Sequence, residues 1–574
     1  MDTFKTPVAR LSRLFQKSRD AWKAKALDKQ RRLRAAQVKI RDLEASRAYW
    51  KDRALAAARD DPRSRAHGAP AAGEGESQET LQRLVRLPPP GHQHSLLVMQ
   101  LALRMYLETG LGSRGVPGVL SLLEPWLPVS LPAQTTVLNW LYRCGLAILQ
   151  QPPERREDWI FVADHTLGLG ASKCLVILGI PASRLVETGY SPDRHAMQVL
   201  AVAVTTHSTG PWVASVLRDV AQRTGVPVQI VADHGSDLHK GIELFQQEQA
   251  PECVETYDIS HRIATLFKAE LSPDERWKGL LGDCRTTLAS FRQTDLAFRL
   301  PPRQRTKARF MHVDTHVEWA RQVLAYHDRG DFSAIRRTCV LSVAAWDHLR
   351  ARLGAARVQP LCTLRGRRYP DQTALCDALR AASDINLNDL DDAFWELADT
   401  GRARFLEGFG WVRSDREDLG VYAQMLEQSK AIQTFLKSKG LHAGVVEPRR
   451  ATLAPRAALT PRAAQFTDRI LDGVAVEAAK ILPGANWLVS SDIIESVFGK
   501  YKTFTARGPL KEIGRLVLAI PAFLTELTPP VIREAMTSVR TLDVEQWVKT
   551  HLGDSMLAKR RQAFRPFAVD META

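Results

Sequence analysis

Two short apolar runs in the middle of the chain end in the same three residues, Ala-Asp-His. One is WIFVADH, which carries Asp164, and the other is VQIVADH, which carries Asp233. Runs of this length and composition predict buried β-strands. A carboxylate at the end of a buried strand is destabilising unless it is well hydrogen-bonded or binds a cation. A single strand-ending Asp often caps the next turn, but two identical endings favour a shared cation site.

The segment from Asp158 to about residue 270 alternates apolar runs with helical patterns. Three strand-like runs come first, DWIFVADHTLGLG, KCLVILGIP and MQVLAVAVTT, separated by glycine or polar residues. A helix, a strand, a second helix from Ser236 to Gln249, another strand and a third helix follow. This order predicts an α/β domain with a mixed sheet. It is similar to the order of the ribonuclease H-like fold, which places acids at strand ends.

Asp164 and Asp233 on neighbouring strands predict a site for divalent cations. Two carboxylates held close together repel each other, and a divalent cation offsets the repulsion. Sites rich in oxygen ligands suit Mg²⁺ or Mn²⁺, and two such ions can stabilise the attacking and leaving oxygens of a phosphoryl transfer. We therefore expect two Mg²⁺ ions, for which Mn²⁺ can substitute.

A third acid stands far along the chain, in SSDIIESVFGKYK. Glu495 lies in the first turns of a predicted amphipathic helix, three residues after Asp492. Asp492 is the expected N-cap, and Glu495 either completes a capping box with it or binds metal. The two roles exclude each other, because a side chain that reaches back to the cap cannot also face the metals. We favour metal binding.

Asp258 and His261 form an Asp-x-x-His motif 25 residues after Asp233, and 262 residues separate Asp233 from Glu495. In this order the acids and the motif resemble those of DDE transposases whose ribonuclease H-like core is interrupted by an all-helical insertion, the hAT-like and related bacterial insertion-sequence groups. The resemblance implies that Asp164, Asp233 and Glu495 are catalytic and bind the metals. It also implies that Asp258 and His261 are auxiliary.

The resemblance covers about residues 158–510. It implies a DNA transposase that cleaves phosphodiester bonds and transfers strands by a two-metal mechanism. In such an enzyme His261 orders the scissile strand or a flipped base. Two alternatives for His261 stay open: it satisfies the core through Asp258, or it is a plain surface histidine.

Lys502 follows Glu495 by seven residues, so both share one face of the predicted helix. This spacing resembles part of a signature of one bacterial transposase group. In that group a Tyr and an Arg stand where this chain has Leu488 and Ser491. Lys502 would be auxiliary to the site by holding a phosphate beside Glu495, and the alternative is a solvated surface lysine.

The charge of the chain points to a polyanionic partner. The sequence has 79 Lys and Arg against 64 Asp and Glu, a net charge of +15, and residues 1–65 alone hold 19 basic and 8 acidic residues. Nucleic acid is the default partner for such a basic arm, and a solvated tail is the alternative. The seven cysteines are scattered without a C-x-x-C pair, and the first residues are polar rather than apolar. We expect a reducing, cytoplasmic and nucleoid-associated location.

Three parts of the chain are predicted to contact double-stranded DNA. They are the basic arm, a helix-turn-helix pattern whose last helix begins after Pro132, and basic patches in the helical segment. Three-helix bundles that do not bind DNA share the same pattern. Outside the arm, the predicted DNA-binding residues are Gln134, Thr135, Thr136, Asn139, Arg303, Arg305, Lys307, Arg309, Arg365, Arg367 and Arg368.

The expected organisation follows from these patterns. An apolar seam from Leu33 to Ala57 predicts a modest coiled coil. Such a coiled coil would help a homodimer or larger assembly to hold two DNA ends. The alternative is a single helix that packs on its own chain. The predicted parts are a basic coiled-coil arm (1–65), a linker (66–79), a helix-turn-helix domain (80–150), a first ribonuclease H-like part (155–270), an all-helical insertion (271–465), a second ribonuclease H-like part (466–525) and a basic helical tail (526–574).

Two other functions compete with transposition. One is a domesticated DNA-binding or architectural protein that keeps the fold without cleaving. The other is a metal-dependent, structure-selective nuclease that cuts without joining. The presence of all three acids disfavours the first alternative.

Overall fold

The chain divides into two compact units, Met1–Leu87 and Pro88–Ala574, and apart from Leu87 every residue described below belongs to the second. The predicted arm, its coiled-coil seam and the linker lie outside the described residues, as do Arg305, Lys307 and Arg309. The computed structural model describes residues 87–124, 130–294, 296–304, 312–330, 338–398, 400–453, 456–508 and 510–564.

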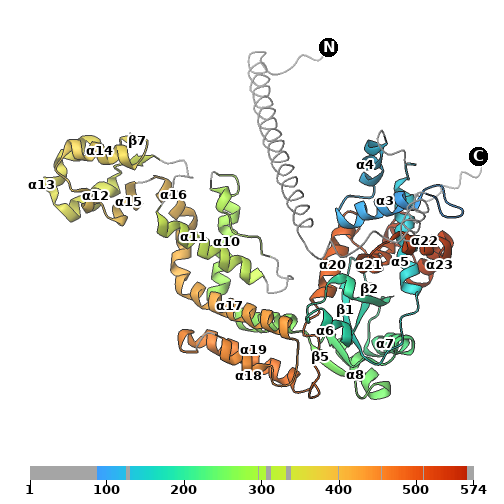
Figure 1. Cartoon of the computed structure of the whole chain (residues 1–574). Coiled ribbons are helices and arrows are strands. Elements are labelled where there is room, and N and C mark those ends of the chain that lie inside the picture. The colour runs from blue at the N-terminus through green and yellow to red at the C-terminus, as the bar shows by residue number, and fades with distance from the viewer. Residues whose placement is uncertain are drawn as a thin grey trace, which may run out of the picture. The chain divides into compact units, whose positions relative to one another are not determined.

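The second unit contains a mixed five-stranded sheet surrounded by helices (Figure 1). Its strand order is β3-β2-β1-β4-β5; β1 pairs antiparallel with β2 and β2 with β3, while β4 pairs parallel with both β1 and β5. The predicted meander followed by alternating helix and strand is therefore confirmed. The strands are β1 (Trp159–Leu167), β2 (Lys173–Pro181), β3 (Gln198–Thr205), β4 (Gln229–Ala232) and β5 (Val254–Tyr257).

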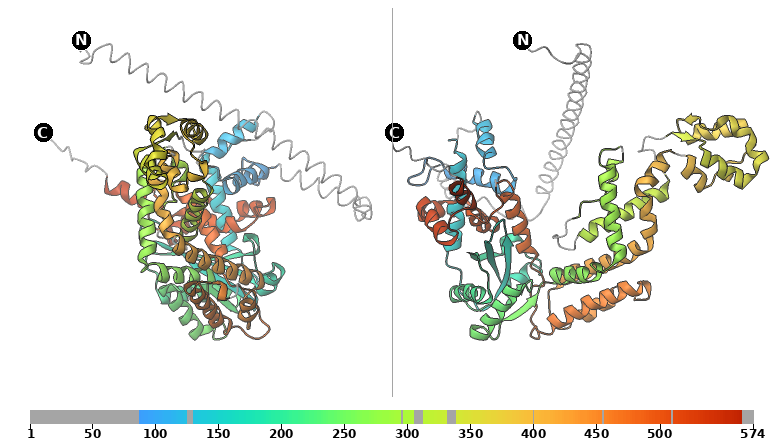
Figure 2. Two further views of the ribbon diagram at one scale, coloured as in Figure 1. Left: turned by 90° about the vertical axis from the view of Figure 1, so that its left-hand side faces the viewer. Right: turned by 180° about the vertical axis from the view of Figure 1, so that it is seen from behind.

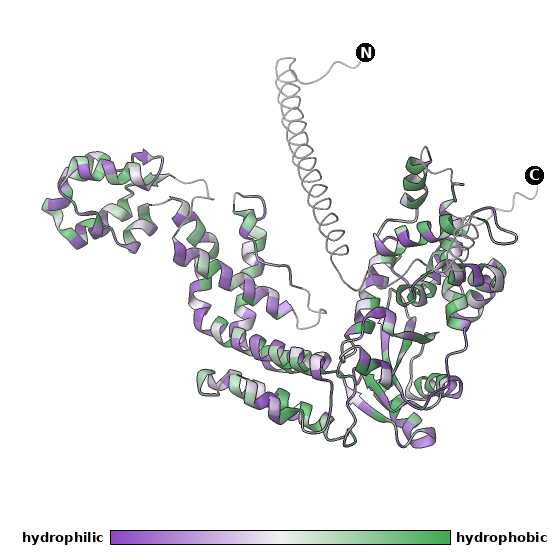
Figure 3. Cartoon of the chain, viewed as in Figure 1, coloured by the Kyte–Doolittle hydropathy of each residue, from purple (hydrophilic) through white to green (hydrophobic). Residues whose placement is uncertain are grey.

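Helices cover both faces of this sheet, and residues of β1 contribute to the hydrophobic core on each face. The strands accordingly contain many hydrophobic residues (Figure 3). On β1, Trp159, Phe161 and Ala163 pack with α7 and α8, whereas Ile160 and Val162 belong to the core shared with α20 and α5. Successive side chains of a strand point to opposite faces, so Asp164 falls on the α20 face. The helices involved are α5 (Gln134–Gln150), α7 (Gly210–Thr224), α8 (Ser236–Gln249) and α20 (Asp492–Thr505).

The helices before β1 and after α20 share one core. Beyond its first turn α5 is mostly buried, and it packs against α3, α21, α22 and α23. Three helices, α3, α4 and α5, lie in the segment of the predicted helix-turn-helix domain, and their core is continuous with that of the C-terminal helices. The remaining elements here are α3 (Leu96–Glu108), α4 (Gly115–Leu123), α6 (Ala182–Glu187), α21 (Ala519–Leu524), α22 (Pro529–Ser538), α23 (Thr541–His551) and α24 (Met556–Ala563).

Gly145 permits the close approach of α5 to the segment before α21. A Cβ atom at this position would lie 1.6 Å from the carbonyl oxygen of Leu518. We expect Gly145→Ala to lower the free energy of unfolding by about 1–3 kcal/mol or more, measured by denaturant unfolding. Gly420→Ala on α17 is the matched control, because its added Cβ meets nothing within 4 Å. That change should stabilise the helix by up to about 1 kcal/mol, and equal effects at the two positions would contradict the packing argument.

The segment between β5 and α20 is mainly helical, as predicted, with one difference. The two-residue strands β6 (Cys339–Val340) and β7 (Arg368–Tyr369) pair antiparallel, and the helices around them enclose a small core of their own, seen as the yellow group in Figure 2. The helices are α9 (Ile259–Leu271), α10 (Glu275–Phe291), α11 (Val313–Arg329), α12 (Val343–Leu353), α13 (Ala355–Val358), α14 (Gln372–Ala382), α15 (Asp392–Ala398), α16 (Thr400–Phe409), α17 (Arg416–Lys439), α18 (Val446–Thr452) and α19 (Pro461–Ala478).

Ion pairs join the two ends of this helical segment. Arg462 on α19 contacts Glu270 through Nε at 2.9 Å and Asp274 through Nη1 at 2.7 Å. Arg469 also reaches Glu270, at 2.8 Å. The chain therefore leaves the core after α9 and returns along α19 at nearly the same place, so the long insertion does not pull the core apart.

Candidate active site

The three predicted acids come from separate elements that meet at one edge of the sheet. Asp233 directly follows the strand β4, as predicted, but Asp164 does not end its strand, because β1 continues to Leu167. Both acids lie just beyond the stretch in which β1 and β4 pair in parallel. Glu495 lies in the first turn of α20, on the face of the sheet to which Asp164 points. The imidazole of His261 lies between two of them, with Nε2 4.0 Å from Oδ2 of Asp233 and Nδ1 3.7 Å from Oε1 of Glu495.

Asp164 lies beside Asp233, because each follows by two residues the paired positions Val162 and Val231 of the adjacent parallel strands. Burial, then the negative charge of Asp233 and to a smaller extent that of Glu495, raise the pKa of Asp164 to about 7. The backbone N–H of His165, which donates to Oδ1 of Asp164 at 2.6 Å, opposes this rise only in part. Asp164 is 9% exposed. A buried carboxyl group next to two other acids is a place where a cation is needed to keep all three ionised.

Asp258 links the start of α9 to the residue that precedes α20. It is fully buried and caps α9, its Oδ1 accepting the backbone N–H of Ser260 at 2.8 Å and its Oδ2 accepting the hydroxyl of Ser491. The same Oδ2 lies 3.8 Å from Nδ1 of His261. Asp258 thus holds Ser491, the residue that precedes α20, by a hydrogen bond and lies within ion-pair distance of His261.

Further contacts fasten the start of α9 to the segment before α20. The N–H of Ile259 donates to the carbonyl oxygen of Val489 at 3.1 Å, and the hydroxyls of Ser260 and Ser490 are 3.2 Å apart. These bonds set the position of Glu495 relative to β5. A positioning role was predicted for neither Ser490 nor Ser491: Ser491 was noted only as the position where one transposase group has an Arg, and the pair of serines just before the acidic helix was the only signal.

The predicted N-cap of α20 was wrong. Ser491 is the N-cap, and its hydroxyl is engaged by Asp258 and makes no capping bond. Asp492 is the first residue of the helix and forms an ion pair with Lys437. Because Asp492 lies inside the helix, the alternative capping box with Glu495 does not form. The Glu495 side chain is directed toward His261 instead.

His261 is expected to be important for activity because it contacts the acids from two strands and a helix. We predict that His261→Asn lowers metal-dependent turnover about 10–100-fold with little loss of melting temperature, since its side chain is 32% exposed. The decisive measurement is the Mg²⁺ concentration that gives half-maximal DNA cleavage. If His261 positions the acids, this concentration should be higher for His261→Asn than for the wild type. His207→Asn, at an exposed site after β3, is the control. An unchanged metal dependence with intact activity would exclude this role.

The other predicted site residues are distributed over the surface. Lys502 is exposed in the last turn of α20, and its phosphate contact remains a prediction. In α5, Thr135 is exposed, whereas Gln134 is half-buried and bonded to Arg114 and Ser113. Also half-buried are Thr136 and Asn139, while Arg303, Arg365, Arg367 and Arg368 are exposed.

Arg365 and the insertion tryptophans show how aromatic residues are used there. The Arg365 guanidinium lies over the Trp346 ring, 5.2 Å from its centroid. Trp319 donates its ring N–H to the carbonyl oxygen of Arg299 at 2.8 Å, and Trp411 donates to the Thr287 hydroxyl at 2.9 Å. Trp319 and Trp411 therefore serve the packing of the insertion.

No family model and no curated protein matches the chain. One solved structure that is similar to it is described as "Drosophila P element transposase strand transfer complex", with 11% sequence identity, coverage of 80% of this chain and 100% of that chain, and a TM-score of 0.31. A TM-score of this size is too low to assign a family or a residue role. The fold class rests on the strand order and pairing of the chain itself, a mixed five-stranded sheet with many helices.

Within the described residues, the helices are too short or too polar to cross a lipid bilayer.

Proposed function

We propose that the chain is a DDE-type DNA transposase with a ribonuclease H-like core. The observation that carries the proposal is the grouping of Asp164, Asp233 and Glu495 around His261 at one edge of a mixed sheet. The three residues are far apart in the sequence. Their meeting supports a common role.

The donor set fits divalent cations of the Mg²⁺ type. Three carboxylates supply only oxygen ligands, which suits Mg²⁺ or Mn²⁺, and burial followed by the charge of Asp233 raises the pKa of Asp164 to about 7. Asp164, Asp233 and Glu495 would hold two such ions. When bound, these ions supply Lewis-acid activation of the attacking oxygen and stabilisation of the leaving oxygen in an in-line displacement.

The chain's own residues then have distinct tasks. Asp164 and Asp233 are held rigidly by β1 and β4, so the ligands are placed before DNA arrives. Glu495 is positioned through the Asp258–Ser491 bond. His261, between Asp233 and Glu495, restrains their side chains and is close enough to contact a bound phosphodiester. Lys502 would contact the DNA backbone farther along α20.

DNA binding follows from charge. The net charge of +15 and the exposed Arg303, Arg365, Arg367 and Arg368 suit contacts with phosphates. The first turn of α5, with Gln134, Thr135, Thr136 and Asn139, would approach the transposon end, and the basic arm would add electrostatic affinity. Two ends must be held together for joining, so a homodimer or larger assembly is proposed.

The test is an assay of both chemical steps on the element's own ends. The full chain is incubated with end DNA, a target plasmid and Mg²⁺, and cleaved and joined products are separated by gel electrophoresis. A transposase gives both products. Cleavage without joining would favour a structure-selective nuclease, and end binding with neither product would favour an architectural protein.

A further inference from the structure

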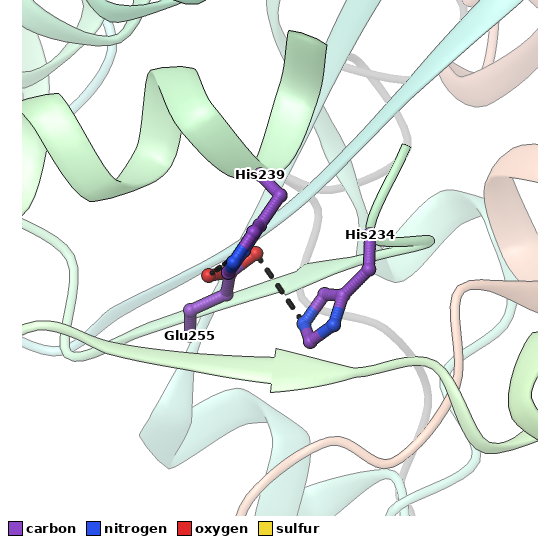
Figure 4. Close-up of side chains that lie close together, drawn as sticks. All are labelled: His234, His239 and Glu255. Carbon is purple, nitrogen blue, oxygen red and sulfur yellow. Dashed lines mark hydrogen bonds and ion pairs between the residues drawn. The ribbon is translucent and has the colours of Figure 1, made fainter. Parts of the chain in front are cut away.

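A second cluster of potential ligands lies beside the acidic site. His234 follows Asp233 in the turn after β4, His239 is on α8, and Glu255 is on β5 (Figure 4). Nδ1 of His239 is 2.8 Å from Oε2 of Glu255, and Nε2 of His234 is 3.4 Å from Oε1. The two imidazole rings and the carboxylate face one another (Figure 4).

Two buried atoms of this cluster lack hydrogen bonds. Neither Nε2 of His234 nor Oε1 of Glu255 has a hydrogen-bond partner among the described residues. The Glu255 side chain is only 8% exposed. A buried carboxylate oxygen without a partner is costly, and a cation between it and the imidazole nitrogen would satisfy both atoms.

The backbone and neighbouring rings hold His234 in this orientation. His234 has φ of +55°, a left-handed conformation that is unusual for a residue with a side chain. Its ring stacks on Tyr257, with centroids 4.3 Å apart and planes 7° from parallel, and also stacks on His239 at 4.8 Å. Tyr257 and Glu255 are themselves fixed, because Glu477 accepts the N–H of Tyr257 and Lys480 donates to the carbonyl oxygen of Glu255.

The positions of the three side chains fit the tetrahedral coordination of a small metal ion. The candidate ligand atoms all lie within 4.8 Å of one another, and atoms bound at about 2.0–2.1 Å to a tetrahedral Zn²⁺ are roughly 3.3 Å apart. Small rotations of the side chains would close the set. Two imidazole nitrogens and one carboxylate oxygen favour Zn²⁺ or a similar transition metal over Mg²⁺, which prefers oxygen ligands alone.

We propose that His234, His239 and Glu255 bind one Zn²⁺ ion, or a similar transition-metal ion, at a site separate from the acidic site. The bound ion would connect the turn that carries Asp233 to α8 and β5. Three protein ligands leave the fourth position for water. The ion would restrain Asp233 through its neighbour His234. The inference does not depend on the proposed transposase function, because ion binding at these residues requires no DNA chemistry.

The test is Zn²⁺ binding by the full chain after metal removal with a chelator. Titration against a chromophoric chelator should show one tightly bound Zn²⁺ in the wild type, with millimolar Mg²⁺ present to occupy the acidic site. We expect His239→Ala and Glu255→Gln each to weaken binding at least ~100-fold. Both should fold, since His239 is half exposed on a helix and Gln matches Glu in shape.

Controls separate this site from the acidic one and from the surface. Asp164→Asn and His207→Ala should keep the wild-type stoichiometry and affinity for Zn²⁺, and Zn²⁺ should raise the melting temperature of the wild type but not of His239→Ala. Co²⁺ in place of Zn²⁺ should give the absorption of a tetrahedral site. Equal Zn²⁺ affinity of wild type and His239→Ala, or loss of binding in Asp164→Asn, would overturn the proposal.

Discussion

Changing Asp164, Asp233 or Glu495 to the corresponding amide is expected to lower Mg²⁺-dependent DNA cleavage at least ~10³-fold, because each change removes an anionic metal ligand without changing side-chain size. Joining should fall in parallel, since both steps use the same acids. The measurement is the initial rate of end cleavage and of strand transfer for Asp164→Asn, Asp233→Asn and Glu495→Gln.

Binding to the DNA ends should survive these changes, which distinguishes loss of chemistry from loss of fold. Asp219→Asn is the matched control, because Asp219 is an exposed acid on α7 of the same domain. It should cleave at the wild-type rate. Cleavage that is indifferent to all three amide substitutions would refute the assignment of the acids.

Asp164→Asn is also expected to stabilise the metal-free protein at neutral and alkaline pH. The pKa of Asp164 rises from 3.8 to about 7 on folding, mainly through burial and the charge of Asp233. The folded chain therefore binds this proton more tightly than the unfolded chain. The stability associated with it is fully present below about pH 4 and is lost as the pH rises to about 7.

The amide of Asn cannot ionise, so the Asp164→Asn variant does not lose stability as the pH rises from about 4 to about 7. Above pH 7.5 the variant should exceed the wild type by on the order of 3–4 kcal/mol in free energy of unfolding, and the difference should vanish near pH 4. Urea unfolding in chelator at pH 4.5, 6 and 8 measures it. Comparing the two proteins at each pH cancels the titrating groups that do not interact with Asp164. Added Mg²⁺ should stabilise only the wild type, and a pH-independent difference would rule out the ionisation argument.

The sheet could be predicted because its strands are short apolar runs with clear breaks. Successive side chains of β1 point to opposite faces of the sheet, so the position of Asp164 in the strand also places it on the face covered by α20. The grouping of Asp164, Asp233 and Glu495 was predictable only through the order of motifs, since nothing local to Glu495 sets it apart from an ordinary helix-start acid.

Other parts of the site depend on contacts that the sequence does not reveal. Ser491 and Asp258 are 233 positions apart, and their bond explains why the cap of α20 was assigned to the wrong residue. The cluster of His234, His239 and Glu255 was also missed, because its spacing follows no known ligand motif and depends on α8 crossing beside β5. The helix-turn-helix pattern predicted α5 but not the burial of most of its length.

The ion pairs that Arg462 makes with Glu270 and Asp274 join the two ends of the helical insertion, and this has a consequence for biosynthesis. Because the helical segment stands between Asp233 and Glu495, a chain emerging from the ribosome contains two of the three acids long before the last is made. The third can join them only after the insertion has folded back and brought α19 alongside α9. A chain that ends before Glu495 thus lacks the complete acidic centre and, under the proposed function, would be unable to cut DNA.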